Sequence, residues 1–169
     1  MTESLKQAGI ISDANVLIDY AKSDPNVLGL INKHISKLYV PSPVLSEVDQ
    51  LNKSDIAKLG IEIIEPSLAQ LIEAAQIRQD KPSVSGEDAI CFVIARDNNW
   101  ACLTNDKALR KYCEDGKVTC IWGIGIMWHL VKTGKLTPQK AFDIAQDIQS
   151  KNKYIAPAVI KRFQKQLGL

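Results

Sequence analysis

Hydrophobic and polar positions alternate along the chain in two patterns. Short apolar runs bounded by polar or turn residues are typical of buried strands, and longer segments with apolar residues three and four positions apart are typical of helices. Five runs predict strands: Ile10–Ser12, Leu38–Val40, Glu62–Ile64, Ala101–Leu103 and Val118–Ile121. Because helical segments separate them, we expect an α/β fold of three layers, with helices on both faces of a mostly parallel sheet.

The helical segments also continue beyond the last predicted strand. Between strands the pattern predicts helices over Ala14–Tyr20, Val27–Ser36, Pro43–Leu51, Leu68–Gln79, from Ser85 through Ala95, and from Ala108 to Cys113 with Gly116 as its end. Beyond the strands it predicts helices over Ile124–Lys132, Pro138–Ser150 and Pro157–Leu167. We therefore expect an α/β core over residues 1–122 and a helical extension over residues 123–169 that packs on the same domain.

Composition restricts the chemistry that this chain can perform. With 169 residues, 46% of them hydrophobic, it has the size of one globular domain. Its apolar runs are too short to cross a bilayer and no basic-then-apolar leader opens it, so we expect a cytoplasmic protein without a membrane partner. The four cysteines lack the spacing of a zinc site, and the chain has only two histidines. Any catalytic chemistry must therefore depend on carboxylates.

Acidic residues follow several of the predicted strands. Asp13 directly follows the first strand, Glu47 lies on the predicted helix after the second, and Asp106 follows the fourth. Because ligands of parallel α/β sheets bind beyond the carboxyl ends of the strands, these three acids are expected at one edge. Asp88 stands at the start of the buried helix that leads into the fourth strand. It joins the other acids if that helix points its start toward the same edge.

Each of these acids also has a purely structural interpretation. Asp13 can cap the first helix, Asp88 can pair with Ser85 in a capping box, Asp106 can complement a helix dipole, and Glu47 can face solvent. The convergence of four carboxylates instead favours a cation site, since clustered carboxylates repel one another unless cations neutralise them. An all-oxygen site suits Mg²⁺ or Mn²⁺, which can activate water for attack on a phosphodiester.

The order of these residues resembles the motifs of the PIN-domain family. The segment from Ser12 to Asp19 is similar to the opening Asp-x-Asn-x-hydrophobic motif of that family, and three further segments, Pro43–Val48, Ser85–Ala89 and Leu103–Arg110, resemble its second, third and fourth motifs. Together they span roughly the first three quarters of the chain and fall on the expected elements.

The resemblance implies a role for each motif residue. Asp13, Glu47, Asp88 and Asp106 would be the catalytic, metal-binding acids. The supporting residues would be Asn15 and Thr104, which would orient the acids through hydrogen bonds, and their neighbour Asn105. Glu87 is placed outside the metal site, because one residue along a helix turns the side chain by about 100°.

The resemblance also implies an activity. It favours a divalent-metal-dependent endoribonuclease that hydrolyses RNA, and in particular the toxin of a toxin–antitoxin pair, with an antitoxin protein and a second copy of the chain as partners. The helical extension resembles that of longer PIN proteins. A housekeeping RNA-processing nuclease and an inactive PIN-like module that binds RNA or protein are the alternatives. A receiver-like or phosphatase-like protein is disfavoured, because the second residue after Asp13 is Asn15 and not another acid.

Two features beyond the motifs have structural interpretations. Trp122 and Trp128 are expected to anchor the core and not to stack on bases. The basic residues between Lys151 and Lys165 are expected on a solvated helix face, since a formal net charge of +2 does not by itself predict nucleic-acid binding.

Overall fold

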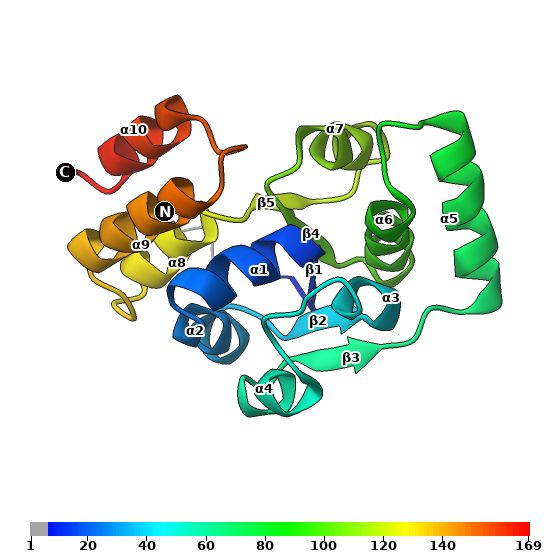
Figure 1. Cartoon of the computed structure of the whole chain (residues 1–169), viewed down its shortest axis with the longest axis horizontal. Helices are drawn as coiled ribbons and strands as arrows, with labels where there is room; N and C mark the ends of the chain where they lie inside the picture. Colours follow the sequence, from blue (N-terminus) through cyan, green and yellow to red (C-terminus); the bar gives the residue numbers. More distant parts are fainter. Residues whose placement is uncertain (1–6) are drawn as a thin grey trace.

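Five strands form one sheet that is parallel throughout. The computed structural model describes residues 7–169, so the first six residues of the predicted domain lie outside the described part. The strands are β1 (Ile10–Ser12), β2 (Leu38–Pro41), β3 (Glu62–Ile64), β4 (Ala101–Thr104) and β5 (Cys120–Trp122). Their order is β3-β2-β1-β4-β5 (Figure 1). The predicted α/β class is confirmed, and the predicted strands differ from the observed ones by at most two residues at either end.

The order of the strands creates a switch point between β1 and β4. From β1 the chain moves outward through β2 to β3, and it then returns to add β4 on the other side of β1. Ser12 pairs with Leu103 in the β1–β4 register, so the residues that leave these two strands start side by side. In open parallel sheets, ligands bind in the crevice at such a switch point, beyond the carboxyl ends of the strands.

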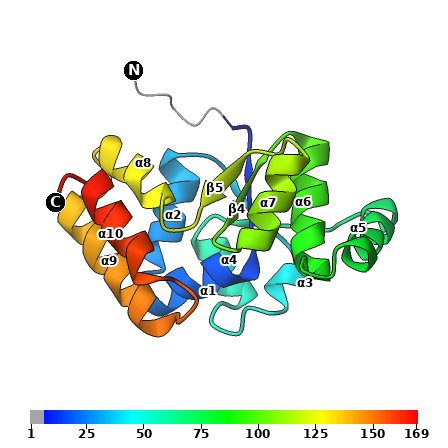
Figure 2. The ribbon, with the colours of Figure 1, turned by 90° about the horizontal axis from the view of Figure 1, so that it is seen from above.

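Ten helices surround the sheet within the described residues. They are α1 (Ala14–Ser23), α2 (Asn26–His34), α3 (Ser42–Leu45), α4 (Lys53–Lys58), α5 (Leu68–Asp80), α6 (Gly86–Asn98), α7 (Lys107–Asp115), α8 (Ile126–Lys132), α9 (Pro138–Lys151) and α10 (Pro157–Gln166). Figures 1 and 2 show α1 and α2 on one face, and α6 and α7 on the other, with α5 outside α6. Every side chain from Ala89 to Ala95 of α6 is buried, as its apolar sequence predicts.

The three C-terminal helices extend the layer of α1 and α2. Helix α9 packs on α1, α8 on α2, and α10 on α9 (Figure 2). Apolar side chains of this segment, such as Ile144 and Phe163, belong to the same buried cluster as Ile10 of the first strand. The extension therefore shares one hydrophobic core with the sheet. None of the helices described for residues 7–169 combines the length and apolar character that a membrane span needs.

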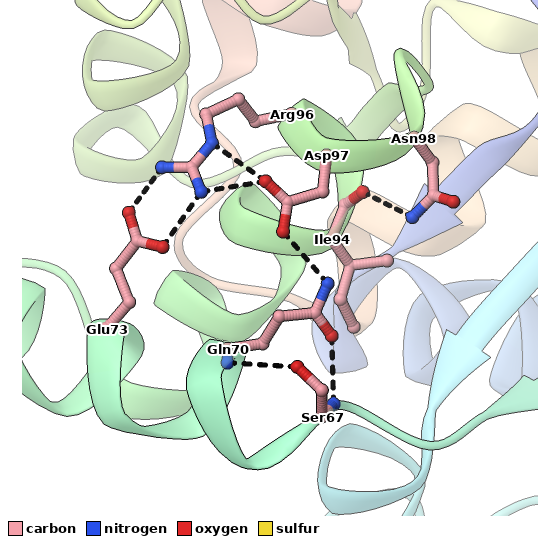
Figure 3. A network of polar contacts seen from close by, with 7 residues as sticks. All are labelled: Ser67, Gln70, Glu73, Ile94, Arg96, Asp97 and Asn98. Carbon is pink, nitrogen blue, oxygen red and sulfur yellow. Dashed lines mark hydrogen bonds and ion pairs between the residues drawn. The ribbon is translucent and has the colours of Figure 1, made fainter.

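A polar network holds α5 against the outer side of α6 (Figure 3). The guanidinium of Arg96 donates to both carboxylate oxygens of Glu73 on α5 and, at 2.7 Å, to Asp97. Gln70 donates to the other oxygen of Asp97 at 3.0 Å and completes a capping box with Ser67. These charged side chains are more than a third exposed, so each pair adds only about 0–1 kcal/mol to stability.

The segment after β2 differs from its prediction. The predicted helix over Pro43–Leu51 is wrong: α3 ends at Leu45, and turns follow it. One physical reason is local competition, because the hydroxyl of Ser46 donates to the carbonyl of Pro43 at 2.6 Å. A separate helix, α4, follows, and the sequence prediction missed it although Asn52 and Asp55 form a reciprocal capping box at its start.

Candidate functional site

Asp13 lies at the centre of the switch point and is almost fully buried, with 1% of its surface exposed. It follows the last residue of β1 and caps α1, since its Oδ1 accepts a hydrogen bond from the backbone N–H of Val16 at 2.9 Å. Its Oδ2 accepts a second hydrogen bond from the hydroxyl of Thr104, the last residue of β4. The predicted cap is thus present, and the same carboxylate is tied to the neighbouring strand.

Thr104 connects two of the predicted acids. Its buried hydroxyl donates to Asp13 and accepts from the backbone N–H of Asp106 at 3.0 Å. Asp106 in turn caps α7, because its Oδ1 accepts from the N–H of Leu109 at 2.8 Å. The Oδ2 atom of Asp106 accepts no hydrogen bond from any residue in the described part of the chain. The hydroxyl thus links the carboxylate of Asp13 to the backbone of Asp106 and holds the end of β1 beside the start of α7.

Asp88 occupies the first turn of α6, whose start faces the same edge. The hydroxyl of Ser85 accepts from the backbone N–H of Asp88 at 3.1 Å and caps the helix. The reciprocal half of a capping box is absent here, whereas α4 and α5 both show it. The structural interpretation in which Asp88 completes a box with Ser85 is therefore wrong, although a hydrogen bond from the Ser85 side chain still lowers the pKa of the Asp88 carboxyl group.

The pKa shifts show that the acids act on one another. The pKa of Asp13 is raised to about 7, mainly by burial and also by the negative charges of Asp88 and Asp106, while hydrogen bonds from Thr104 and Val16 oppose the shift. Burial also raises the pKa of Asp88 to about 6, with added repulsion from Asp106 and from Glu47. Carboxylates from the ends of β1 and β4, from α6 and from the turn after α3 thus lie within electrostatic reach of one another.

Glu47 lies at the outer side of this group. It stands in the turn after α3 and not on a helix, which corrects the sequence prediction, and its side chain is exposed. Partial desolvation raises its pKa, and the charge of Glu87 raises it further. Glu87, which we expected outside the site, is therefore close enough to Glu47 and Asp88 to affect both.

The donors have the chemistry of a site for a hard divalent cation. Carboxylate oxygens are the ligands that Mg²⁺ and Mn²⁺ prefer, and a bound cation would stabilise the charged forms of Asp13 and Asp88, whose pKa values are raised by burial and by repulsion between the acids. As the side chains of residues 7–169 are placed, however, no three histidine, cysteine, aspartate or glutamate residues are close enough to hold one ion together. Metal binding at this edge would therefore require the acidic side chains to come closer together.

The two predicted asparagines take different positions. The side chain of Asn15 is exposed and forms no hydrogen bond with other residues of the described chain. Asn105 packs beside Gly123, where an added Cβ would lie 2.6 Å from its Nδ2. It also lowers the pKa of Asp19 through a hydrogen bond. Asn105 thus contacts both Asp19 of α1 and Gly123 at the start of the C-terminal segment.

Asp19 is a buried acid that the sequence interpretation did not select. Only 7% of its surface is exposed, and burial raises its pKa. The side-chain amide of Asn152, at the end of α9, donates to both of its oxygens at 2.9 and 3.2 Å. One signal was available: Asp19 lies three residues after Val16 and one before Tyr20, on the apolar face of a predicted helix. The contact ties α1, which Asp13 caps, to the C-terminal helices.

Comparison with known proteins gives one match. A family model described as a PIN domain matches residues 9–169, and the matched range includes the C-terminal helices as well as the whole sheet. A search of curated proteins finds no match.

Proposed function

Because the chain belongs to the PIN-domain family, whose fold is that of nucleases, we propose that it hydrolyses RNA phosphodiester bonds with divalent metal ions. The observation that supports this most strongly is that Asp88 and Asp106 raise the pKa of the buried Asp13 at the β1–β4 switch point and that Asp106 raises the pKa of Asp88, both in addition to burial. Buried carboxylates that repel one another are unfavourable for folding alone, and they are retained where a cation or a reaction uses them.

The proposed roles follow from the contacts of each side chain. Asp13, Glu47, Asp88 and Asp106 would hold Mg²⁺ or Mn²⁺, and the bound ions would supply an activated water and neutralise charge that develops on the phosphate. Thr104 would keep Asp13 and Asp106 oriented through its two hydrogen bonds.

The remaining predicted residues would assist this site from its rim. Asn15, exposed at the start of α1, would contact RNA or a metal-bound water, and Asn105 would support the loop after β4.

The decisive experiment is a cleavage assay on a mixed pool of structured RNAs. Wild-type protein is incubated with Mg²⁺, with Mn²⁺ and with EDTA, beside Asp106→Asn and the exposed control Asp80→Asn at the end of α5. We expect metal-dependent cuts by wild type and by the control, and a loss of at least a hundredfold in Asp106→Asn. Equal cleavage by wild type and Asp106→Asn would exclude this site, and cleavage that persists in EDTA would exclude the metal mechanism.

The second candidate is a PIN-like module that binds RNA without cutting it. One observation favours it: among the described residues, no three acidic side chains lie close enough together to hold a metal ion. Isothermal titration with Mn²⁺ separates the two candidates. Binding of Mn²⁺ that is lost in Asp13→Asn supports the nuclease, whereas RNA binding without Mn²⁺ binding or cleavage supports the module.

The finer proposal is that the nuclease is the toxin of a toxin–antitoxin pair, with an antitoxin and a second copy of the chain as partners. Induced expression in a bacterial host should then arrest growth, and Asp106→Asn should not. A housekeeping RNA-processing nuclease would instead be tolerated when expressed and would leave defined RNA ends. Size-exclusion chromatography with light scattering tests the expected homodimer.

A further inference from the structure

Two arginines from distant parts of the chain meet on one indole ring. Trp122 ends β5 and is half-buried, Arg110 lies on α7, and Arg162 lies on α10. The guanidinium carbon of Arg110 lies 4.8 Å from the centroid of the Trp122 ring, and that of Arg162 lies 5.7 Å from it. In both Figure 1 and Figure 2, β5 lies between α7 and α10.

Both guanidinium groups are without an anionic partner. No carboxylate of residues 7–169 forms an ion pair with Arg110 or Arg162, whereas Arg96 on α6 is paired with Glu73 and Asp97. Two positive charges beside one ring repel each other, and cation–π contacts hold the groups in place without neutralising them. The planar fork of arginine donors matches the oxygens of a phosphate group. This cluster therefore has the charge and the shape to bind phosphate.

The cluster lies directly beside the acids. Trp122 pairs with Thr104 in the β4–β5 register, and Thr104 carries the hydroxyl that joins Asp13 to Asp106. Arg110 follows Asp106 by one helical turn, and its N–H donates to the Asp106 carbonyl at 3.0 Å. Trp122 therefore lies on the strand next to the one that Thr104 ends. An RNA strand held at the acids would need cations nearby, because the acids themselves repel its backbone.

We propose that Arg110 and Arg162, held against Trp122, form a subsite for RNA phosphates next to the bond that is cut. The proposal rests on the proposed function and deepens it, because it gives the substrate strand a path from the acids across β5. It also gives α10 a direct role in substrate binding. Arg162 is exposed, and it differs from Lys161 and Lys165 of the same helix, which are exposed without contacting an aromatic ring among the described residues.

The test measures RNA binding without cleavage. Binding of a fluorescent single-stranded RNA is followed by anisotropy in EDTA, between 50 and 200 mM salt, for wild type, for Arg110→Gln/Arg162→Gln and for the control Lys165→Gln. Each lost phosphate contact should reduce the slope of log K against log salt by about 0.7. We expect the double variant to lose about 1.4 in slope and the control to match wild type. Circular dichroism and the melting temperature confirm that the variants are folded.

A second variant separates charge from geometry. Arg162→Lys keeps the positive charge but loses the forked donors, so its slope should stay near wild type while its affinity falls several-fold. An unchanged slope in the double variant, an equal loss in Lys165→Gln, or no RNA binding by wild type would each overturn the subsite. If only the subsite proposal is wrong, wild type still cleaves RNA in a metal-dependent way. Arginine-dependent binding without any cleavage would instead overturn the nuclease and keep the subsite.

Discussion

Replacing Asp13 with asparagine is expected to stabilise the metal-free protein while it abolishes cleavage. Asparagine has nearly the same size and keeps an oxygen to cap the N–H of Val16, but it carries no charge. Burial raises the pKa of Asp13 from 3.8 to about 7, so ionising this carboxyl group favours the unfolded chain. A shift of about three pKa units corresponds to a loss of about 4 kcal/mol of folding stability at pH values well above 7, where the group is charged.

The sign of the pH dependence follows from proton binding. The folded state binds the Asp13 proton more tightly than the unfolded state, so this contribution is fully present below pH 3.8 and is lost as the pH rises through about 7. Between pH 5 and pH 8 the wild type should therefore lose roughly 2–3 kcal/mol from this group, and the asparagine variant should not. The altered hydrogen bond to Thr104 offsets about 1 kcal/mol of the gain.

Urea unfolding in EDTA at pH 5, 6, 7 and 8, followed by circular dichroism, measures this difference. Added Mg²⁺ or Mn²⁺ should raise the stability of wild type and leave Asp13→Asn unchanged, because a ligand stabilises only the state that binds it. Asp80→Asn, at an exposed position, serves as the control and should follow wild type throughout. The reasoning is refuted if Asp13→Asn is no more stable than wild type at pH 8 while the wild-type curve is flat.

Three further substitutions test the surroundings of the acids. Thr104→Val keeps the shape but removes both hydrogen bonds of the buried hydroxyl, so urea unfolding should show a loss of about 1–3 kcal/mol and assays a lower cleavage rate. Gly123→Ala places a Cβ 2.6 Å from the amide nitrogen of the neighbouring asparagine, and a fall in melting temperature is expected, whereas Gly29→Ala, with its nearest contact at 3.6 Å, should not lower it. Asn152→Ala leaves the buried carboxylate of Asp19 with one fewer donor, so hydrogen exchange should become faster in α9 and α10.

Local patterns were sufficient to predict the strands and the edge of the sheet at which two of the acids lie. Ile10–Ser12 and Glu62–Ile64 were predicted at their observed bounds, because a short apolar run between polar residues is typical of a strand and too short for a helix. Asp13 directly follows β1, Asp106 follows β4 after one intervening residue, and the parallel order of the strands carries both to one edge.

Contacts between distant residues could not be predicted in the same way. The Asp19–Asn152 hydrogen bonds join residues 133 positions apart, and the hydroxyl of Tyr20 donates to the carbonyl of Gly123 across 103 positions. No local pattern specifies which polar partner a buried side chain will find. The position of Arg162 is a similar case, because a basic helix face predicts solvent and only the packing of α10 brings that residue to Trp122.

The structural and catalytic interpretations of the acids turn out to be compatible. A helix cap needs one carboxylate oxygen, and the Oδ1 atoms of Asp13 and Asp106 accept from the helix N–H groups while Oδ2 faces elsewhere. Capping also fixes the carboxylate at the end of its strand, which is where a cation between β1 and β4 would need it. The sequence could not separate the two interpretations because one local arrangement, an acid between a strand and a helix, supports both. Two independent caps would not affect each other's pKa. The charge of Asp106, which follows the neighbouring strand, helps to raise the pKa values of Asp13 and Asp88, and this effect favours a shared site.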